Sequence, residues 1–316
     1  MSATRTDAEA RGCGILARVK PLLTVITGPT ASGKTGIAVE LARRAGGEIV
    51  NADSQQVYRS FDIGTAKPSP EELAAVPHHL ISVVDPLEPF SAAEYQRRAD
   101  AAIADITSRG RPVFLVGGTG LYLRILLHGV VEAPGADPTL RASLEAMAAA
   151  EGREAVHRKL VEVDPETAAK LPTQDLVRVI RALEIHAQTG IPASQWRRDH
   201  GFAPDRYPFR MFVLEPPREQ LYATINARTG AMFARGLVEE TRELMARGFT
   251  EAAPMRSVGY VQARAVVEGR MTREEAIQDT ARETRRYAKR QLTWFRKEPG
   301  AVHVAPPYGA LRQLDT

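Results

Sequence analysis

The strongest constraint on how this chain can fold is a glycine loop with the pattern G-x-x-x-x-G-K-T. The apolar run 22–26 precedes the loop, and residues 37–44, whose apolar side chains suit a helix packed on a sheet, follow it. This context is typical of a phosphate-binding P-loop and disfavours the alternative of a chance glycine loop. The loop comprises Gly28, Pro29, Thr30, Ala31, Ser32, Gly33, Lys34 and Thr35.

Such a loop binds an anion because successive backbone N–H groups and the N-terminus of the following helix converge on one point. Gly28 and Gly33 let the backbone curl without Cβ clashes. Lys34 adds a positive charge, and the Thr35 hydroxyl can ligate Mg²⁺. The sequence therefore predicts a diphosphate or triphosphate site, and leaves the rest of the ligand open.

Composition points to an ordinary globular protein of one large or two smaller domains. The chain has 316 residues, of which 44% are hydrophobic and 25% charged, and no apolar run approaches membrane-spanning length. Residues 1–21 carry several charges and lack an apolar core segment, so we expect a loose tail and not a signal peptide. The single cysteine, Cys13, lies in that tail, which excludes a disulfide framework and favours a cytoplasmic location.

Two further predicted strands end in polar residues. Residues 48–53 read as a strand with Asp53 at its carboxyl end, where open α/β sheets bind ligands. Asp53 can be a turn-former or helix cap, or a functional carboxylate that faces the phosphates. Strand 112–116 runs into Gly117-Gly118-Thr119-Gly120, without the acid by which P-loop ATPases help to hold their metal. This disfavours a motor ATPase and leaves a small-molecule kinase open.

The sequence pattern changes in the middle of the chain, where helix signals replace the alternation of predicted strands and helices. Asp137-Pro138 and Asp164-Pro165 are helix starts, and no strand-like run interrupts residues 137–190. We therefore predict an all-helical insertion, 137–204, within an α/β core formed by 22–136 and 205–316. Arg178 and Arg181 share a helix face there, and solvated charge is the slightly favoured interpretation.

Downstream, a return strand at 211–214 is followed by a helix that places Arg228 on an apolar stripe with Leu221, Ile225 and Met232. An arginine in such a place needs a partner. It can pair with an internal carboxylate, or it can point at phosphates, to which its planar guanidinium is suited. The residues alone favour neither alternative.

Residues 282–297 are strongly basic. They hold seven basic residues against Glu283, and 7 − 1 = +6 exceeds the +4 of the whole chain. With Trp294 among them, the charges suit phosphate contacts and base stacking. The alternative is a solvated face over a core stripe. The basic residues are Arg282, Arg285, Arg286, Lys289, Arg290, Arg296 and Lys297.

Taken together, the motifs resemble those of the bacterial tRNA dimethylallyltransferase family, also called tRNA isopentenyltransferases. They are the P-loop, D-S-x-x-V-Y at 53–58, D-I-G-T-A-K-P at 62–68, G-G-T-G-L-Y at 117–122 and K-R-Q-x-T-W at 289–294. The resemblance implies a P-loop kinase-like α/β fold, a parallel sheet flanked by helices, with a helical insertion domain that contacts tRNA.

The resemblance also implies the reaction. A dimethylallyl group passes from dimethylallyl diphosphate to N6 of the adenine immediately 3′ of the anticodon, with Asp53 as general base. Thr119 and Arg228 are implied to contact the diphosphate, and the eight P-loop residues are implied to hold this prenyl diphosphate in place of a nucleotide such as ATP. We expect Mg²⁺ as cofactor, with Thr35 as a ligand, and a monomer whose partners are dimethylallyl diphosphate and the tRNA anticodon stem-loop, with no membrane.

The implied tRNA contacts span five segments of the chain. They are Asp53, Ser54, Gln55, Gln56, Arg141, Arg178, Arg181, Arg256, Ser257, Val258, Gly259, Tyr260, Val261, Lys289, Arg290, Gln291, Leu292, Thr293, Trp294, Phe295 and Arg296. Two other functions stay open. A small-molecule or nucleoside kinase would turn over ATP without RNA, and a catalytically idle tRNA-binding protein would sense a phosphate ligand without forming a product.

Overall fold

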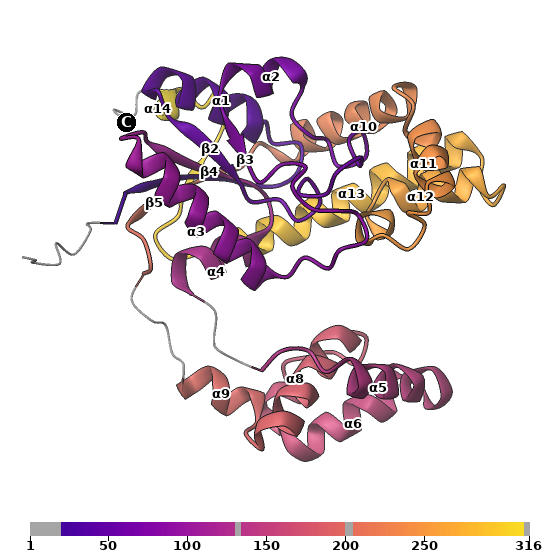
Figure 1. Ribbon diagram of the computed structural model, residues 1–316. Coiled ribbons are helices and arrows are strands. Elements are labelled where there is room, and N and C mark those ends of the chain that lie inside the picture. The colour runs from indigo at the N-terminus through magenta and orange to yellow at the C-terminus, as the bar shows by residue number, and fades with distance from the viewer. Residues whose placement is uncertain (1–19, 130–133, 200–204, 313–316) are drawn as a thin grey trace, which may run out of the picture.

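The computed structural model describes residues 20–129, 134–199 and 205–312. Its centre is a six-stranded sheet of order β3-β2-β4-β1-β5-β6, in which every neighbouring pair is parallel (Figure 1). The strands are β1 (Leu23–Thr27), β2 (Glu48–Asn51), β3 (His78–His79), β4 (Val113–Val116), β5 (Phe209–Leu214) and β6 (Val302–Val304). The predicted α/β class with a parallel sheet is confirmed.

Helices cover both faces of this sheet, as parallel strands require. The helices of this half are α1 (Lys34–Ala45), α2 (Pro70–Ala75), α3 (Ala92–Ser108) and α4 (Gly120–His128). One apolar cluster joins the strands to α3 and α4, and another joins them to α1 and the short α14 (Gly309–Arg312). The Ser91 side chain accepts a hydrogen bond from the Glu94 amide and so caps α3.

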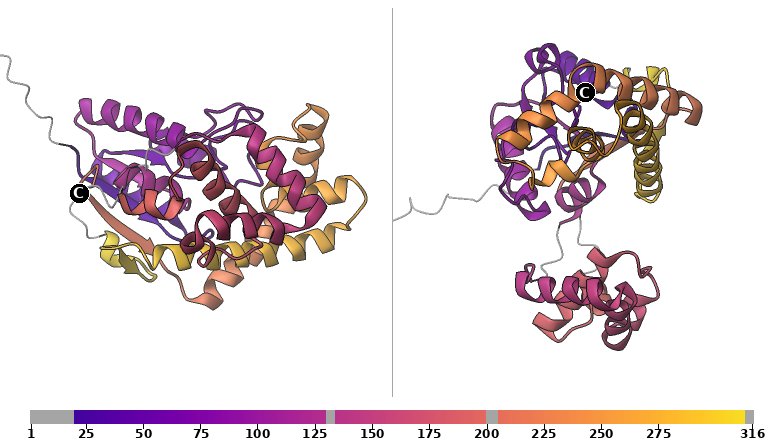
Figure 2. Two further views of the ribbon diagram at one scale, coloured as in Figure 1. Left: turned by 90° about the horizontal axis from the view of Figure 1, so that it is seen from below. Right: turned by 90° about the vertical axis from the view of Figure 1, so that its right-hand side faces the viewer.

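Residues 134–199 contain helices and no strand within their described length. The helices are α5 (Pro138–Glu151), α6 (Arg153–Val163), α7 (Pro165–Ala168), α8 (Leu176–Thr189) and α9 (Ala193–Asp199). Asp137 and Asp164 cap α5 and α7, and the segment has an apolar cluster of its own. Both figures draw it as a lobe beside the sheet (Figures 1 and 2). Its boundaries at 137 and 204 stay a prediction, because residue 204 lies outside the described chain, as do Cys13 and residues 1–19 of the predicted tail.

The last part of the chain adds a second helical group against the sheet. It contains α10 (Arg218–Ala234), α11 (Leu237–Ala246), the 3₁₀ turn η1 (Ala253–Arg256), α12 (Tyr260–Val267) and α13 (Arg273–Phe295). Thr272 and Glu275 form a capping box at the start of α13. This helix runs the length of the core (Figure 2, left) and packs on α10. Within the described residues, no helix combines the length and apolar character needed to cross a membrane.

Candidate active site

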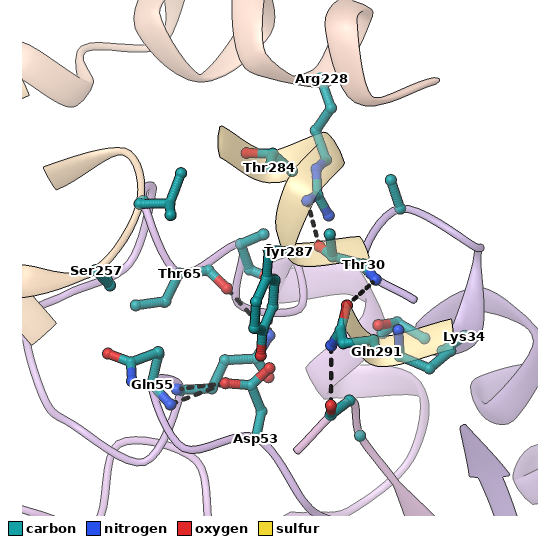
Figure 3. Close-up of a pocket in the computed structure, with 18 of the residues that line it drawn as sticks. Thr30, Lys34, Asp53, Gln55, Thr65, Arg228, Ser257, Thr284, Tyr287 and Gln291 are labelled. Carbon is teal, nitrogen blue, oxygen red and sulfur yellow. Dashed lines mark hydrogen bonds between the residues drawn. The ribbon is translucent and has the colours of Figure 1, made fainter. Parts of the chain in front are cut away.

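A cavity of about 660 Å³ lies at the carboxyl ends of the central strands, and its volume is in the range of small-molecule sites. Its walls come from the P-loop, the loop after β2, the loop after β4, α10, residues 256–258 and α13 (Figure 3). Parallel strands bring the ends of β1, β2 and β4 to one edge, so segments far apart in the sequence meet there.

The P-loop forms one wall, and Lys34 is its charged group. Lys34 Nζ donates hydrogen bonds to the carbonyl oxygens of Gly28 (3.0 Å) and Pro29 (2.7 Å). Burial lowers the pKa of Lys34 to about 7; the Asp53 carboxylate opposes this shift and Arg228 adds to it. Gly28 has a φ of 140°, and a Cβ there would lie 2.5 Å from the carbonyl oxygen of Leu214, so the loop needs glycine at that point.

Five of the eight predicted diphosphate residues line the cavity directly. The remaining three, Gly28, Pro29 and Ser32, shape the loop behind it. The five are Thr30, Ala31, Gly33, Lys34 and Thr35.

Asp53 forms a local turn and also faces the cavity, and its role as a functional carboxylate stays a prediction. Its Oδ1 accepts hydrogen bonds from the amides of Gln55 (2.8 Å) and Gln56 (3.3 Å), so it forms the local turn. It also lines the cavity that holds Lys34 and Arg228, and its charge acts on the pKa values of both. The carboxylate and the phosphate loop therefore face one space (Figure 3).

Arg228 reaches the same space from α10. Its Nη2 donates a hydrogen bond to Oγ1 of Thr30 at 2.5 Å. Burial lowers the pKa of Arg228 and the Asp53 carboxylate opposes that shift. Among the described residues no carboxylate lies within ion-pair distance of this guanidinium. Of the two alternatives for Arg228, the hydrogen bond to the P-loop agrees with a phosphate-directed role.

Thr119 lies just behind the cavity wall. Its Oγ1 accepts a hydrogen bond from the Ser54 amide (3.0 Å), and its own amide donates to the carbonyl oxygen of Ala52 (3.1 Å). The cavity lining includes the two preceding glycines, Gly117 and Gly118. Thr119 therefore fixes the loop that carries Asp53, and its predicted contact with the diphosphate stays a prediction.

The wall formed by α13 contains residues that the sequence analysis missed. Thr280, Thr284, Tyr287 and Gln291 recur at i, i+4, i+7 and i+11 and face the cavity. Figure 3 shows the Tyr287 ring between Arg228 and Asp53, and partial burial together with the Asp53 carboxylate raises the pKa of its phenol. Only Gln291 of this stripe was predicted, because the surrounding charges dominate the sequence pattern. The stripe itself, at helical spacing, was the available signal.

The predicted tRNA contacts near the core divide into three groups. Eight line the cavity, namely Asp53, Ser54, Gln55, Gln56, Arg256, Ser257, Val258 and Gln291. Five are exposed, namely Val261, Lys289, Arg290, Thr293 and the C-cap residue of α13, Arg296. Five pack inward, namely Gly259, Tyr260, Leu292, Trp294 and Phe295. Tyr260 is fully buried, and its hydroxyl donates to Glu240 and accepts from the Gly64 amide (3.2 Å).

The predicted arginines of the helical segment do not line the cavity. Arg141 makes a two-point contact with Glu184, at 3.1 and 2.8 Å, and the Glu184 side chain is fully buried. Arg181 donates to the carbonyl oxygens of Pro134 and Gly135. Arg178 is exposed and pairs with Asp175. All three thus have partners within the protein, and their contacts with tRNA stay predictions.

Metal binding by protein ligands alone finds no support in the described part of the chain, where no group of three or more His, Cys, Asp or Glu is placed to hold an ion. Mg²⁺ however binds commonly through one or two carboxylates together with substrate phosphates. Thr35 and Asp53 both line the cavity. The residues therefore fit an ion that arrives with a phosphorylated ligand.

Comparison with known proteins gives consistent matches. A family model described as IPP transferase matches residues 56–298. The chain is 80% identical to a tRNA dimethylallyltransferase of Myxococcus xanthus over 295 residues, which cover 93% of this chain and 96% of that protein. A tRNA dimethylallyltransferase of Anaeromyxobacter dehalogenans is 56% identical over 287 residues, covering 90% and 95% of the two chains.

Solved structures agree. The full-length tRNA isopentenylpyrophosphate transferase from Bacillus halodurans is 42% identical, with a TM-score of 0.67 and 90% of each chain covered. A eukaryotic dimethylallyltransferase, described as acting on tRNA, is 26% identical, with a TM-score of 0.76, and the match covers 94% of this chain and 76% of that one.

Proposed function

The chain belongs to the IPP transferase family, and from this premise we propose how its cavity transfers a dimethylallyl group to tRNA. The donor is dimethylallyl diphosphate, and the acceptor is N6 of the adenine immediately 3′ of the anticodon. The observation that carries the proposal is that Asp53 and the P-loop share one cavity.

Asp53 acts as the general base. An exocyclic adenine amine is a poor nucleophile, and a carboxylate within hydrogen-bond reach can take its proton during attack. As the N6–carbon bond forms, the bond between the dimethylallyl carbon and the diphosphate oxygen breaks, and its electron pair leaves with the diphosphate. The N6 proton passes to Asp53, whose turn contacts with Gln55 and Gln56 hold the carboxylate at the cavity wall.

The leaving diphosphate needs positive partners that are already in place. Lys34, Arg228 and the P-loop amides supply them from two sides of the cavity. The Thr35 hydroxyl and the diphosphate oxygens would hold Mg²⁺, which supplies charge neutralisation on the leaving group when bound. The pKa of Lys34 is about 7 from the protein groups alone, and an adjacent diphosphate would raise it.

The target adenine must leave its stack in the anticodon loop to reach Asp53. A cavity of about 660 Å³ has room for such a base beside the diphosphate. The exposed cations Lys289 and Arg290 on α13 would contact RNA phosphates, with Arg256 at the cavity wall. We further propose that the helical insertion 137–204 contacts the tRNA and that the enzyme works as a cytoplasmic monomer.

The test uses an anticodon stem-loop RNA, dimethylallyl diphosphate and Mg²⁺, with mass spectrometry of the digested RNA. We expect one dimethylallyl group on the adenine 3′ of the anticodon, and none on an RNA in which guanine replaces that base. Asp53→Asn retains an oxygen for the Gln55 amide, yet removes the base, and should slow product formation by about 100-fold or more. Undiminished modification by that variant would remove Asp53 as the base.

Two further measurements separate the other functions. ATP hydrolysis or transfer that persists without RNA would indicate a small-molecule kinase. Salt-sensitive tRNA binding with no product from any prenyl donor would indicate an idle tRNA-binding protein.

A further inference from the structure

We propose that Gln291 is a positioning residue that ties the P-loop to the loop after β4, and that it does not act as a tRNA contact. The inference rests on the proposed function of the cavity. Gln291 Oε1 accepts a hydrogen bond from the Thr30 amide at 2.8 Å, and Nε2 donates to the carbonyl oxygen of Gly118 at 2.9 Å (Figure 3). The side chain is 7% exposed. Both ends of its amide are therefore used by protein.

Two of the three glycines after β4, Gly118 and Gly120, fit closely to α13. A Cβ on Gly118 would lie 2.4 Å from Nε2 of Gln291, and a Cβ on Gly120 would lie 2.3 Å from Nε1 of Trp294. The Trp294 ring also lies under the guanidinium of Arg124, 4.5 Å from its centroid. The motifs at 117–122 and 289–294, far apart in the sequence, thus form two sides of one tight contact.

This contact determines how Thr30 can meet a ligand. The Thr30 amide is used by Gln291, while its Oγ1 accepts from Arg228 at 2.5 Å. Thr30 is therefore held from α13 through its backbone and from α10 through its side chain. Loss of the Gln291 contact would leave the Thr30 backbone without its support from α13. The P-loop would then be less firmly held on the side that faces Arg228.

The same helix turns its cations outward. Lys289 and Arg290 are exposed, and neither forms an ion pair within the part of the chain that the structure describes. The adjacent Gln291 points inward to the P-loop. A structural basis thus exists for α13 to bind RNA on one side and to order the diphosphate cradle on the other, and the two effects can be measured separately.

The experiment compares Gln291→Ala with Gln278→Ala, a control on an exposed position of the same helix. Binding of dimethylallyl diphosphate is measured by calorimetry without RNA, and binding of the anticodon stem-loop by fluorescence at several salt concentrations. We expect Gln291→Ala to weaken diphosphate binding about tenfold and to leave the RNA dissociation constant and its salt slope as in the wild type. Gln278→Ala should change neither.

Gly118→Ala provides a second perturbation from the opposite side, because the new methyl group would displace the Gln291 amide. We expect it to weaken diphosphate binding alone, and to add no further loss in a Gln291→Ala background, where the space is free. Wild-type diphosphate affinity in Gln291→Ala, or a loss of RNA binding in its place, would overturn the proposal. Neither result depends on product formation, so a failure of the proposed prenyl transfer would be seen separately.

Discussion

Nη2 of Arg228 donates a hydrogen bond to Oγ1 of Thr30 at 2.5 Å, and so joins α10 to the P-loop across the mouth of the cavity. The two residues are 198 positions apart in the sequence. The contact shows how a guanidinium on an apolar helix face is accommodated without a carboxylate partner: it lies against the site where an anionic ligand would bind.

Arg228→Gln should lower kcat/KM for dimethylallyl diphosphate by roughly 100- to 1,000-fold, the usual loss when one charge-stabilising donor is removed. Arg228→Lys should recover only part of it, because an ammonium lacks the planar fork. Steady-state kinetics with saturating RNA measures both. Arg235→Gln, at the exposed C-cap of the same helix, is the matched control. Equal activity of Arg228→Gln and the control would contradict the assignment.

Lys34 should make diphosphate binding depend on pH. Burial lowers the pKa of Lys34 to about 7. Without a bound anion, the Lys34 ammonium therefore loses its proton above pH 7. Because an anionic ligand binds the protonated form, affinity should be highest below pH 7 and should fall as pH rises, by up to about tenfold per unit. Calorimetry without RNA, in two buffers of different ionisation enthalpy, would detect proton uptake on binding above pH 7.

Lys34→Arg is the control for that titration, since an arginine keeps its charge at every pH used. Its affinity need not match the wild type, but its dependence on pH should be flat. A flat profile in the wild-type protein would show that Lys34 is not the titrating group.

We expect the main role of the Arg141–Glu184 pair to be stabilisation of the folded helical segment. Arg141→Met leaves the fully buried Glu184 with a hydrogen bond from the Asp137 amide (3.2 Å) and a longer contact to Arg181 (3.5 Å), and we expect a loss of roughly 3 kcal/mol in unfolding free energy. The double variant Arg141→Met/Glu184→Met should recover most of the stability by removing the buried charge. Urea unfolding measures both.

RNA binding by the same two proteins tests the predicted tRNA contact of Arg141. If Arg141 binds a phosphate, the stable double variant still binds the stem-loop more weakly than the wild type. Wild-type RNA affinity in the double variant would leave Arg141 with its structural role alone.

Lys289 and Arg290 should each contribute one phosphate contact. Lys289→Gln should reduce the slope of log K against log salt by about 0.7 to 0.9 without changing diphosphate affinity. Arg296 gives an informative contrast, because it pairs with Glu215, and Arg296→Gln should change the slope by less. If the wild type, Lys289→Gln and Arg296→Gln gave the same slope of log K against log salt, this face of α13 would not contact the RNA backbone.

Local signals explain why so much of the fold could be predicted. The P-loop pattern, the strand before it and the helix starts at Asp137 and Asp164 each act over a few residues, and the structure confirms them. The short strand β3 has no such signal: it is only His78–His79, because the chain then leaves the sheet and forms an isolated bridge, Tyr58 to Val84.

The sequence predicts those parts of the site that follow from the type of a residue and from its position at the end of a strand. Asp53 and the P-loop were expected to meet because parallel strands align their carboxyl ends. Tyr287 was missed because the orientation of α13 is decided by its packing on α10 and on the loop after β4, and neither contact has a sequence signal. The pairing of Arg141 with Glu184 joins residues 43 apart, and charge counts alone predict solvated side chains there.

Because α13 forms one wall of the cavity, the point during translation at which the protein can bind diphosphate depends on a late part of the chain. The P-loop ends at residue 35, yet the side chain that holds the Thr30 amide is at position 291. The ribosome therefore releases the anion-binding loop early and its last support near the end of translation. A nascent chain that stops before α13 would contain the whole P-loop but lack the side chain that accepts the Thr30 amide hydrogen bond, so full diphosphate affinity should be reached only once almost the whole polypeptide has emerged.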